Sequence, residues 1–157
     1  PHHTQTICIT RDEPMTETVQ SAIAARLDAL SIPSRIDTDS YPSIVALFEE
    51  AFATYQNEAA CSSVGHTLTY ADLDRLSAHF AGWLQHGAGL ERGDRVAVQM
   101  PNLIQYLVVC LGALRAGMVV VNTNPLYTER ELEHQLNDAN VKLMVLQANV
   151  AQTAAAV

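Results

Sequence analysis

Apolar residues recur at helical spacing near the start of this 157-residue chain. In residues 16–30 the spacing is three or four positions, which predicts a helix with one apolar face formed by Val19, Ile23, Leu27 and Leu30. The stretch "SIPSRIDTDSYP" follows, and its prolines and Asp/Ser cluster indicate a linker. Residues 1–39 are therefore predicted to be an N-terminal extension and linker, and residues 40–157 a globular part.

The globular part opens with two more helical patterns and a hairpin between them. The first pattern, residues 43–56, places on one face Val45, Phe48, Phe52 and Tyr55. The stretch "AACSSVGHTLTY" predicts a β-hairpin in which Gly65 supplies the turn. The second helical pattern begins at Tyr70 and is predicted to end at Gly87.

Residues 94–146 alternate between short apolar runs and helical patterns. The runs "DRVAVQM", "MVVVN" and "VKLMVL" predict strands, and the segments between them predict helices, the first capped by Asn102. The strands are apolar on both faces, as in parallel sheets covered by helices. The predicted fold class is α/β: an open, mostly parallel sheet with helices on both faces, preceded by a helical N-terminal extension and a β-hairpin.

The apolar run of residues 103–121 is almost long enough to span a membrane. It contains Gln105 and Arg115, however, and Gly117 indicates a helix end within it. We therefore interpret the run as a buried helix followed by a buried strand.

The net charge of the chain and the spacing of its cysteines argue against some classes of function. A formal charge of −8 and a pI near 5.0 disfavour binding to the phosphate backbone of nucleic acids. Cys8, Cys61 and Cys110 lie far apart and lack metal-ligand spacing, which favours reduced, buried thiols in a cytoplasmic protein. No signal peptide is recognisable at the N-terminus.

The stretch "VVVNTNPLYTERELEHQL" combines a strand end, a polar loop and a helix start. Thr128 and Glu131 have the spacing of a capping box, so that carboxylates already occupy the positive end of the helix. This favours an architectural loop over an anion site. Because ligand crevices form at strand ends, Asn122, Asn124 and Tyr127 are nevertheless the candidate substrate-region residues.

Other catalytic and binding motifs are incomplete. The glycines of "HGAGLERGDRV" precede a strand, whereas a phosphate loop follows one. The single lysine, Lys142, has no glycine-rich neighbourhood, and no Gly-x-Ser-x-Gly motif occurs. Glu131 and His134 form only one Glu-x-x-His pair, where a di-iron site needs two. We predict no catalytic, cofactor-binding or metal-binding residue in this chain.

Three stretches resemble bacterial long-chain fatty acid–CoA ligases of the adenylate-forming, AMP-binding superfamily. They are "IPSRIDTDSYPSIVALFEEAF", "LTYADLDRLSAHFAGWLQ" and "GDRVAVQMPNLIQYLVVCLGALRAGMVVVNTNPLYTERELEHQLNDA". The resemblance covers residues 31–155 and includes two superfamily motifs, around 68–76 and 114–125. It identifies the chain as similar to the N-terminal subdomain of such a ligase.

For a full-length enzyme the resemblance implies adenylation of a fatty acid by ATP with Mg²⁺, followed by thioester formation with CoA. The family's nucleotide-handling motifs lie downstream of the matched region, so the chain alone is expected to be inactive and to need the remainder of the ligase as its partner. The resemblance implies a cytoplasmic protein, and leaves open a homodimer and peripheral association with the inner membrane. A stand-alone α/β binding or oligomerisation module is the alternative hypothesis.

Overall fold

The computed structural model describes residues 17–33 and 39–157, and its contacts divide the chain into two units, Pro1–Ser40 and Tyr41–Val157. In the first unit, helix α1 (Glu17–Ala29) confirms the predicted N-terminal helix. Val19 and Ile23 on its predicted apolar face are 46% and 44% exposed. Cys8 and the middle of the predicted linker lie outside the described residues.

The second unit begins with a helix, a hairpin and a long helix. These are α2 (Ile44–Thr54), β1 (Ala59–Ser63), β2 (His66–Thr69) and α3 (Tyr70–His86). The strands pair antiparallel, and the turn between them has positive φ at Val64 (49°) and Gly65 (77°). The predicted hairpin with Gly65 in its turn is confirmed, and two successive positive φ angles match the handedness of a tight hairpin turn.

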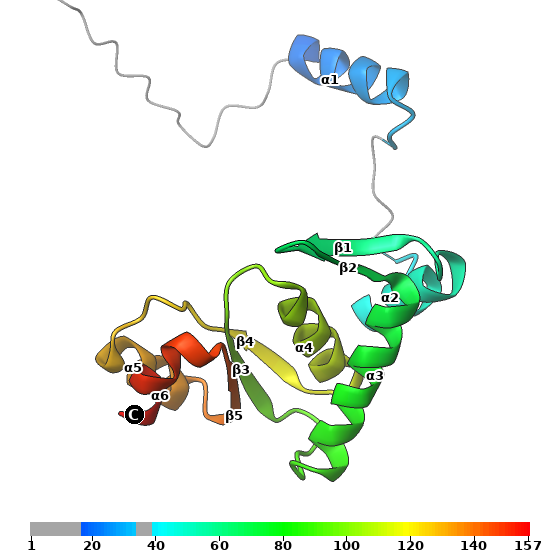
Figure 1. Ribbon diagram of the computed structural model, residues 1–157. Coiled ribbons are helices and arrows are strands. Elements are labelled where there is room, and N and C mark those ends of the chain that lie inside the picture. Colours follow the sequence, from blue (N-terminus) through cyan, green and yellow to red (C-terminus); the bar gives the residue numbers. More distant parts are fainter. Residues whose placement is uncertain (1–16, 34–38) are drawn as a thin grey trace, which may run out of the picture. The chain divides into compact units, whose positions relative to one another are not determined.

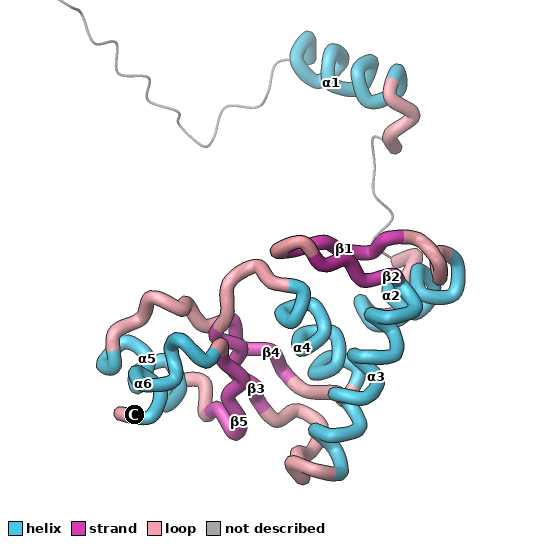
Figure 2. Tube along the Cα trace, in the orientation of Figure 1, coloured by secondary structure: helices cyan, strands magenta, loops and turns pink. Residues whose placement is uncertain are grey.

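Strands and helices alternate through the rest of the unit (Figures 1 and 2). The order is β3 (Arg95–Gln99), α4 (Ile104–Arg115), β4 (Val119–Asn122), α5 (Glu129–Asp138), β5 (Val141–Leu146), a 3₁₀ turn (Ala148–Val150) and α6 (Ala151–Ala155). The three strands are parallel, in the order β4-β3-β5. In Figure 1 the sheet has α4 and α3 on one side and α5 and α6 on the other, which confirms the predicted fold class.

The central strand β3 lies in the core between the two helical layers. Val96, Ala97 and Val98 are at most 1% exposed. The outer strands are less covered, and Val119 at the start of β4 is 46% exposed. The apolar run of residues 103–121 divides into α4 and β4, as predicted, and none of the described helices is long and apolar enough to cross a membrane.

Helices α3 and α4 approach each other closely at Gly112. A Cβ atom at this position would lie 2.8 Å from the Ser77 carbonyl oxygen and 2.8 Å from a Phe80 ring carbon. Ser77 is fully buried at the same contact. Only a residue without a side chain allows α4 to lie this close to α3.

Arg115, at the end of α4, connects three helices. Its guanidinium lies 2.7 Å from the Asp74 carboxylate and donates to the Asp74 carbonyl and to the Ser77 hydroxyl, both at 2.9 Å. The same group lies 5.5 Å from the centroid of the Phe52 ring of α2. Because the Arg115 side chain is only 21% exposed, these contacts are shielded from solvent more than an ordinary surface ion pair.

The helix starts confirm one predicted cap and correct another. Thr128 and Glu131 form the predicted capping box, and Thr69 and Asp72 form a second one that the sequence reading missed. Asn102 does not cap α4: the N-cap residue is Leu103, which makes no side-chain cap bond. The prediction for Asn102 is wrong because the helix begins one residue later than the Pro-Asn pair suggested.

The glycine that ends α3 is required for packing rather than for an unusual backbone angle. Gly87 has φ −92°, which any residue can adopt, and its amide donates to the Trp83 carbonyl. A Cβ atom there would lie 2.5 Å from the Trp83 ring. The predicted helix end is confirmed, and a side chain at position 87 would require the Trp83 indole to shift.

We expect Arg115→Met to lower the free energy of unfolding by about 1–2 kcal/mol, because it removes charged hydrogen bonds in a partly shielded site. Urea titration of the chain measures this loss. The control is Arg75→Met, which removes an ion pair with Asp72 whose arginine side chain is 57% exposed and should change the stability by no more than about 0.5 kcal/mol. Equal losses in the two variants would contradict the structural role of Arg115.

The capping box at α5 predicts an acid-sensitive contribution to stability. Hydrogen bonds from the Thr128 amide and hydroxyl hold the pKa of Glu131 below its ordinary value of 4.5. A carboxylate whose pKa is depressed on folding stabilises the fold above its unfolded pKa, and this stabilisation is lost as the pH falls through the lower, folded pKa.

Thr128→Ala should therefore be less stable than the wild type near neutral pH and should lose less stability between about pH 5 and about pH 3. Thr128→Ser keeps the hydroxyl and should follow the wild type at both ends of the titration. Urea midpoints measured across this range test the expectation, and an identical acid response of all three proteins would refute it.

Candidate functional site

The carboxyl ends of β3 and β4 form the place where an open parallel sheet can bind a ligand. The two strands are adjacent, with Val98 beside Asn122. From β3 the chain continues into α4 on one side of the sheet, and from β4 it continues into α5 on the other (Figure 1). Open parallel sheets bind ligands in crevices outside the carboxyl ends of their strands, and the two connections border such a crevice here.

A small cavity of about 250 Å³ occupies this position. Its lining comes from the end of β3, the first turns of α4 and the loop after β4: Val98, Met100, Asn102, Tyr106, Asn122, Thr123 and Asn124. The amide and phenol groups lie over an apolar floor formed by Val98 and Met100. We refer to these seven residues as the strand-end crevice.

Asn122, the last residue of β4, is held by hydrogen bonds from two helices. The Tyr106 hydroxyl of α4 donates to Asn122 Oδ1 at 2.8 Å, and Gln135 Nε2 of α5 donates to the Asn122 carbonyl at 3.1 Å. Asn122 itself is exposed, so these bonds fix a residue at the rim of the crevice.

Asn124 is held by a hydrogen bond from strand β3 and by hydrogen bonds within its own turn. Gln99 Nε2 of β3 donates to the Asn124 carbonyl at 3.1 Å, and Asn124 Oδ1 accepts from the Leu126 amide at 3.0 Å. The Tyr127 amide also donates to the Asn124 carbonyl, at 3.2 Å. The carbonyl and side-chain oxygens of Asn122 and Asn124 are therefore used in holding the loop itself.

The crevice is electrically neutral near pH 7. A hydrogen-bonding interaction with the Cys110 side chain raises the pKa of Tyr106, and burial raises it further. Burial also raises the pKa of the Cys110 thiol behind it. Both groups therefore stay protonated, and none of the seven lining residues carries a charge. Such a site suits neutral hydrogen-bonding groups better than an anion.

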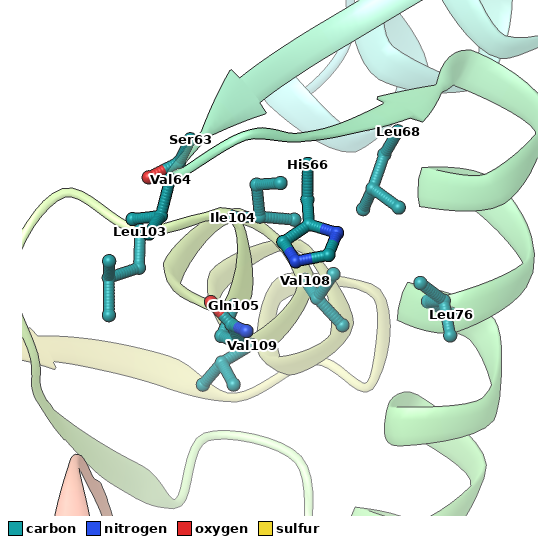
Figure 3. A pocket seen from close by; sticks show the side chains of 10 residues that line it. All are labelled: Ser63, Val64, His66, Leu68, Leu76, Leu103, Ile104, Gln105, Val108 and Val109. Carbon is teal, nitrogen blue, oxygen red and sulfur yellow. The ribbon is translucent and has the colours of Figure 1, made fainter.

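A larger apolar groove lies on the other side of the first turn of α4. It encloses about 710 Å³ and is lined by Ser63, Val64, His66, Leu68, Leu76, Leu103, Ile104, Gln105, Val108 and Val109. Figure 3 shows these side chains reaching in from the hairpin, from α3 and from α4. At the hairpin turn Val64 is 83% exposed, so the groove ends in an uncovered apolar side chain.

The residues around these cavities do not fit the phosphates of a nucleotide. A phosphate cradle needs a turn after a strand whose amides point at the anion, and usually contains glycine. The turns after β3 and β4 contain Pro101 and Pro125, which lack an amide hydrogen, and neither turn contains glycine. In residues 17–33 and 39–157 no three His, Cys, Asp or Glu side chains lie together as metal ligands would.

The structure brings two of the three candidate residues to the crevice. Asn122 and Asn124 line it, whereas Tyr127 is half-buried in the turn beyond and is not part of the lining. A contact of any of the three with substrate stays a prediction. The sequence did not point to Tyr106, Gln99 or Gln135, because their hydrogen bonds depend on which strands become neighbours in the sheet. One local signal for Tyr106 was its position four residues after Asn102, which puts both side chains on the same side of the chain near the start of α4.

Comparison with known proteins agrees with this architecture. Residues 48–157 match the AMP-binding enzyme family. Long-chain-fatty-acid–CoA ligase of Escherichia coli O157:H7 is 50% identical over 122 residues, and that of Bacillus subtilis 41% identical over 103 residues. The matched segments are 78% and 66% of this chain but 22% and 18% of those ligases, so the chain spans about a fifth of the length of these relatives.

Solved structures share the fold. The complex of VinN with 3-methylaspartate superposes with a TM-score of 0.70 at 32% identity, over 74% of this chain and 33% of that one. The Mycobacterium tuberculosis fatty acyl CoA synthetase gives a TM-score of 0.68 at 27% identity, over 73% and 23% of the two chains. The chain belongs to the AMP-binding enzyme family, and is homologous to the N-terminal part of long-chain fatty acid–CoA ligases.

Proposed function

We propose that this chain is the N-terminal subdomain of a ligase that activates a long-chain fatty acid with ATP and Mg²⁺ and transfers the acyl group to CoA. The observation that carries the proposal is the 50% identity over 122 residues to ligases with that specificity in their names. Coumarate–CoA ligase-like 3 of Arabidopsis thaliana is also similar, but at 38% over 95 residues. The higher identity favours the fatty-acyl branch.

Within such a ligase, the described unit supplies scaffold and surface rather than reacting groups. The neutral crevice and the adjoining turns offer no phosphate cradle, so ATP, Mg²⁺ and CoA would be bound by other parts of the protein. The apolar groove of Figure 3 offers side chains of the kind that would contribute to the wall of an acyl-binding region. Asn122, Asn124 and Tyr127 are proposed as its polar border.

The charge of helix α1 concerns contact with a membrane, and the edges of the sheet concern contact with another protein or another part of the ligase. We infer a cytoplasmic protein in which peripheral contact with the inner membrane is weak. Helix α1 has exposed apolar residues, but its one basic residue, Arg26, is outnumbered by two acidic residues, Glu17 and Asp28. Electrostatic attraction to anionic lipids therefore adds little to its affinity for a membrane. The outer strands β4 and β5 each pair on one side only, which supports contact with the remainder of the ligase or a homodimer.

The chain alone should not bind ATP. We expect isothermal titration with ATP and Mg²⁺ to give no saturable heat, because the described turns lack the amides and cations that hold phosphates. Titration with ATP of the Escherichia coli ligase is the positive control. One-site, saturable binding by the isolated chain would show that it contains a nucleotide site and would overturn the division of roles proposed above.

A chimera tests the proposed activity directly. Replacing the matched 122-residue segment of the Escherichia coli ligase by the corresponding residues of this chain should keep the fatty acid-dependent release of AMP within about tenfold of the parent. A second chimera carrying Gly112→Val should lose activity, because the added side chain separates α3 from α4. A folded first chimera without ligation of long-chain substrates would contradict the proposal.

A further inference from the structure

The tip of the β1–β2 hairpin is strained as well as exposed. Val64 has a φ of 49°, in the left-handed region, and its side chain is 83% exposed. A β-branched residue is an outlier there, whereas Asn adopts this conformation readily and Asn-Gly is a preferred pair in a two-residue hairpin turn. Gly65, with a φ of 77°, already supplies the second position of such a pair. Neither the backbone nor the surrounding water therefore favours valine at position 64.

The hairpin tip stands at one end of a larger concave surface. It lines the apolar groove of Figure 3, and a second cavity of about 260 Å³ lies beside that groove. The residues that line both are Ser63, Leu103 and Ile104. The second cavity in turn shares Asn102 and Tyr106 with the strand-end crevice. The three cavities therefore adjoin one another along the start of α4.

The residues of this concave surface differ in charge from the rest of the chain. Charged residues make up 17% of the chain, but no Asp, Glu, Lys or Arg is among the residues that line the three cavities. Charged residues are typical of surfaces that face water, whereas the buried centres of protein interfaces are depleted of them. An uncharged hollow that ends in an exposed valine thus has the composition of a contact surface.

We propose that the hairpin tip and the rim of the groove are a docking surface for an apolar part of the remainder of the ligase, which roofs the groove. This inference rests on the proposed function. Most of such a ligase is available as the roof, because the segment matched by this chain is 22% of the length of the Escherichia coli relative. An acyl-binding wall also needs a roof, since an alkyl chain is stabilised only where it is removed from water and the groove is open at Val64.

Docking predicts that one substitution acts with opposite signs in the isolated chain and in the ligase. Val64→Asn relieves the backbone strain, so it should raise the melting temperature of the isolated chain by about 2–4 °C. In the ligase the same change buries an amide in an apolar contact and should lower the melting temperature. A residue whose only role was to form the turn would give the same sign in both proteins.

Gln105→Glu provides a second variant that leaves the hairpin intact. Gln105 is an exposed residue of the groove lining in the first turn of α4, where the helix dipole favours a carboxylate. The isolated chain should therefore keep its melting temperature within about 1 °C. Docking buries the new charge without a partner, so the ligase should lose stability.

Thermal unfolding of the isolated chain and of the Escherichia coli chimera described above tests both variants. The control is Thr67→Ala, which removes a hydroxyl that lies 2.6 Å from the Ser62 hydroxyl. Thr67 alternates along β2 with the groove residues His66 and Leu68 and so faces away from the groove. It should lower the melting temperature in both proteins.

The activity of the parent chimera tests the proposed function, whereas the melting temperatures test the docking surface, so either can fail without the other. Failure of Val64→Asn or Gln105→Glu to lower the melting temperature of the chimera would overturn the inference. This includes a fall that appears only after saturation with a long-chain fatty acid, because the acyl chain itself would then cover the groove. Loss of self-association of the isolated Val64→Asn chain in sedimentation, with the chimera unchanged, would assign the surface to a second copy instead.

Discussion

The close contact between α3 and α4 is the constraint on which the rest of the unit depends. At Gly112 the two helices are separated by less than a side chain, and the buried Ser77 completes the contact. This position brings Arg115 within reach of Asp74 and Phe52, and thereby connects α2 to the helix pair. It also sets where the first turn of α4 lies, and this turn contributes residues both to the apolar groove and to the strand-end crevice.

The crevice shows that a place typical of ligand binding can be occupied largely by bonds that hold the chain in shape. The loop after β4 receives hydrogen bonds from β3, α4 and α5, and the helix it leads into begins with its own carboxylate at the positive end. What remains open to a ligand is a neutral, partly apolar surface. This chemistry agrees with a subdomain that borders a substrate while phosphates are bound elsewhere in the protein.

Helical periodicity predicted the helices, whereas continuous apolar runs predicted the three parallel strands and the Gly65 turn predicted the hairpin. The Thr128–Glu131 box was predictable because its bonds are local. The cap assigned to Asn102 was wrong, since one residue of difference in the helix start depends on the exit angle of β3. The hydrogen bonds of Gln99, Gln135 and Tyr106 to Asn124 and Asn122 could not be predicted, because they require the order β4-β3-β5 and the side of the sheet taken by each helix.

The strand order also has a consequence for how the chain assembles. β3 is the central strand although it precedes both of its neighbours along the chain, and parallel neighbours can join it only after an intervening helix has been laid down. β3 and β4 pair residues 24 positions apart (Arg95 with Val119), whereas α3 and α4 meet through residues 38 and 41 positions apart (Arg115 with Ser77 and with Asp74). As the polypeptide leaves the ribosome, the helix pair and the β3–β4 pair can thus both form once residue 122 has been made, whereas β5 joins the sheet later.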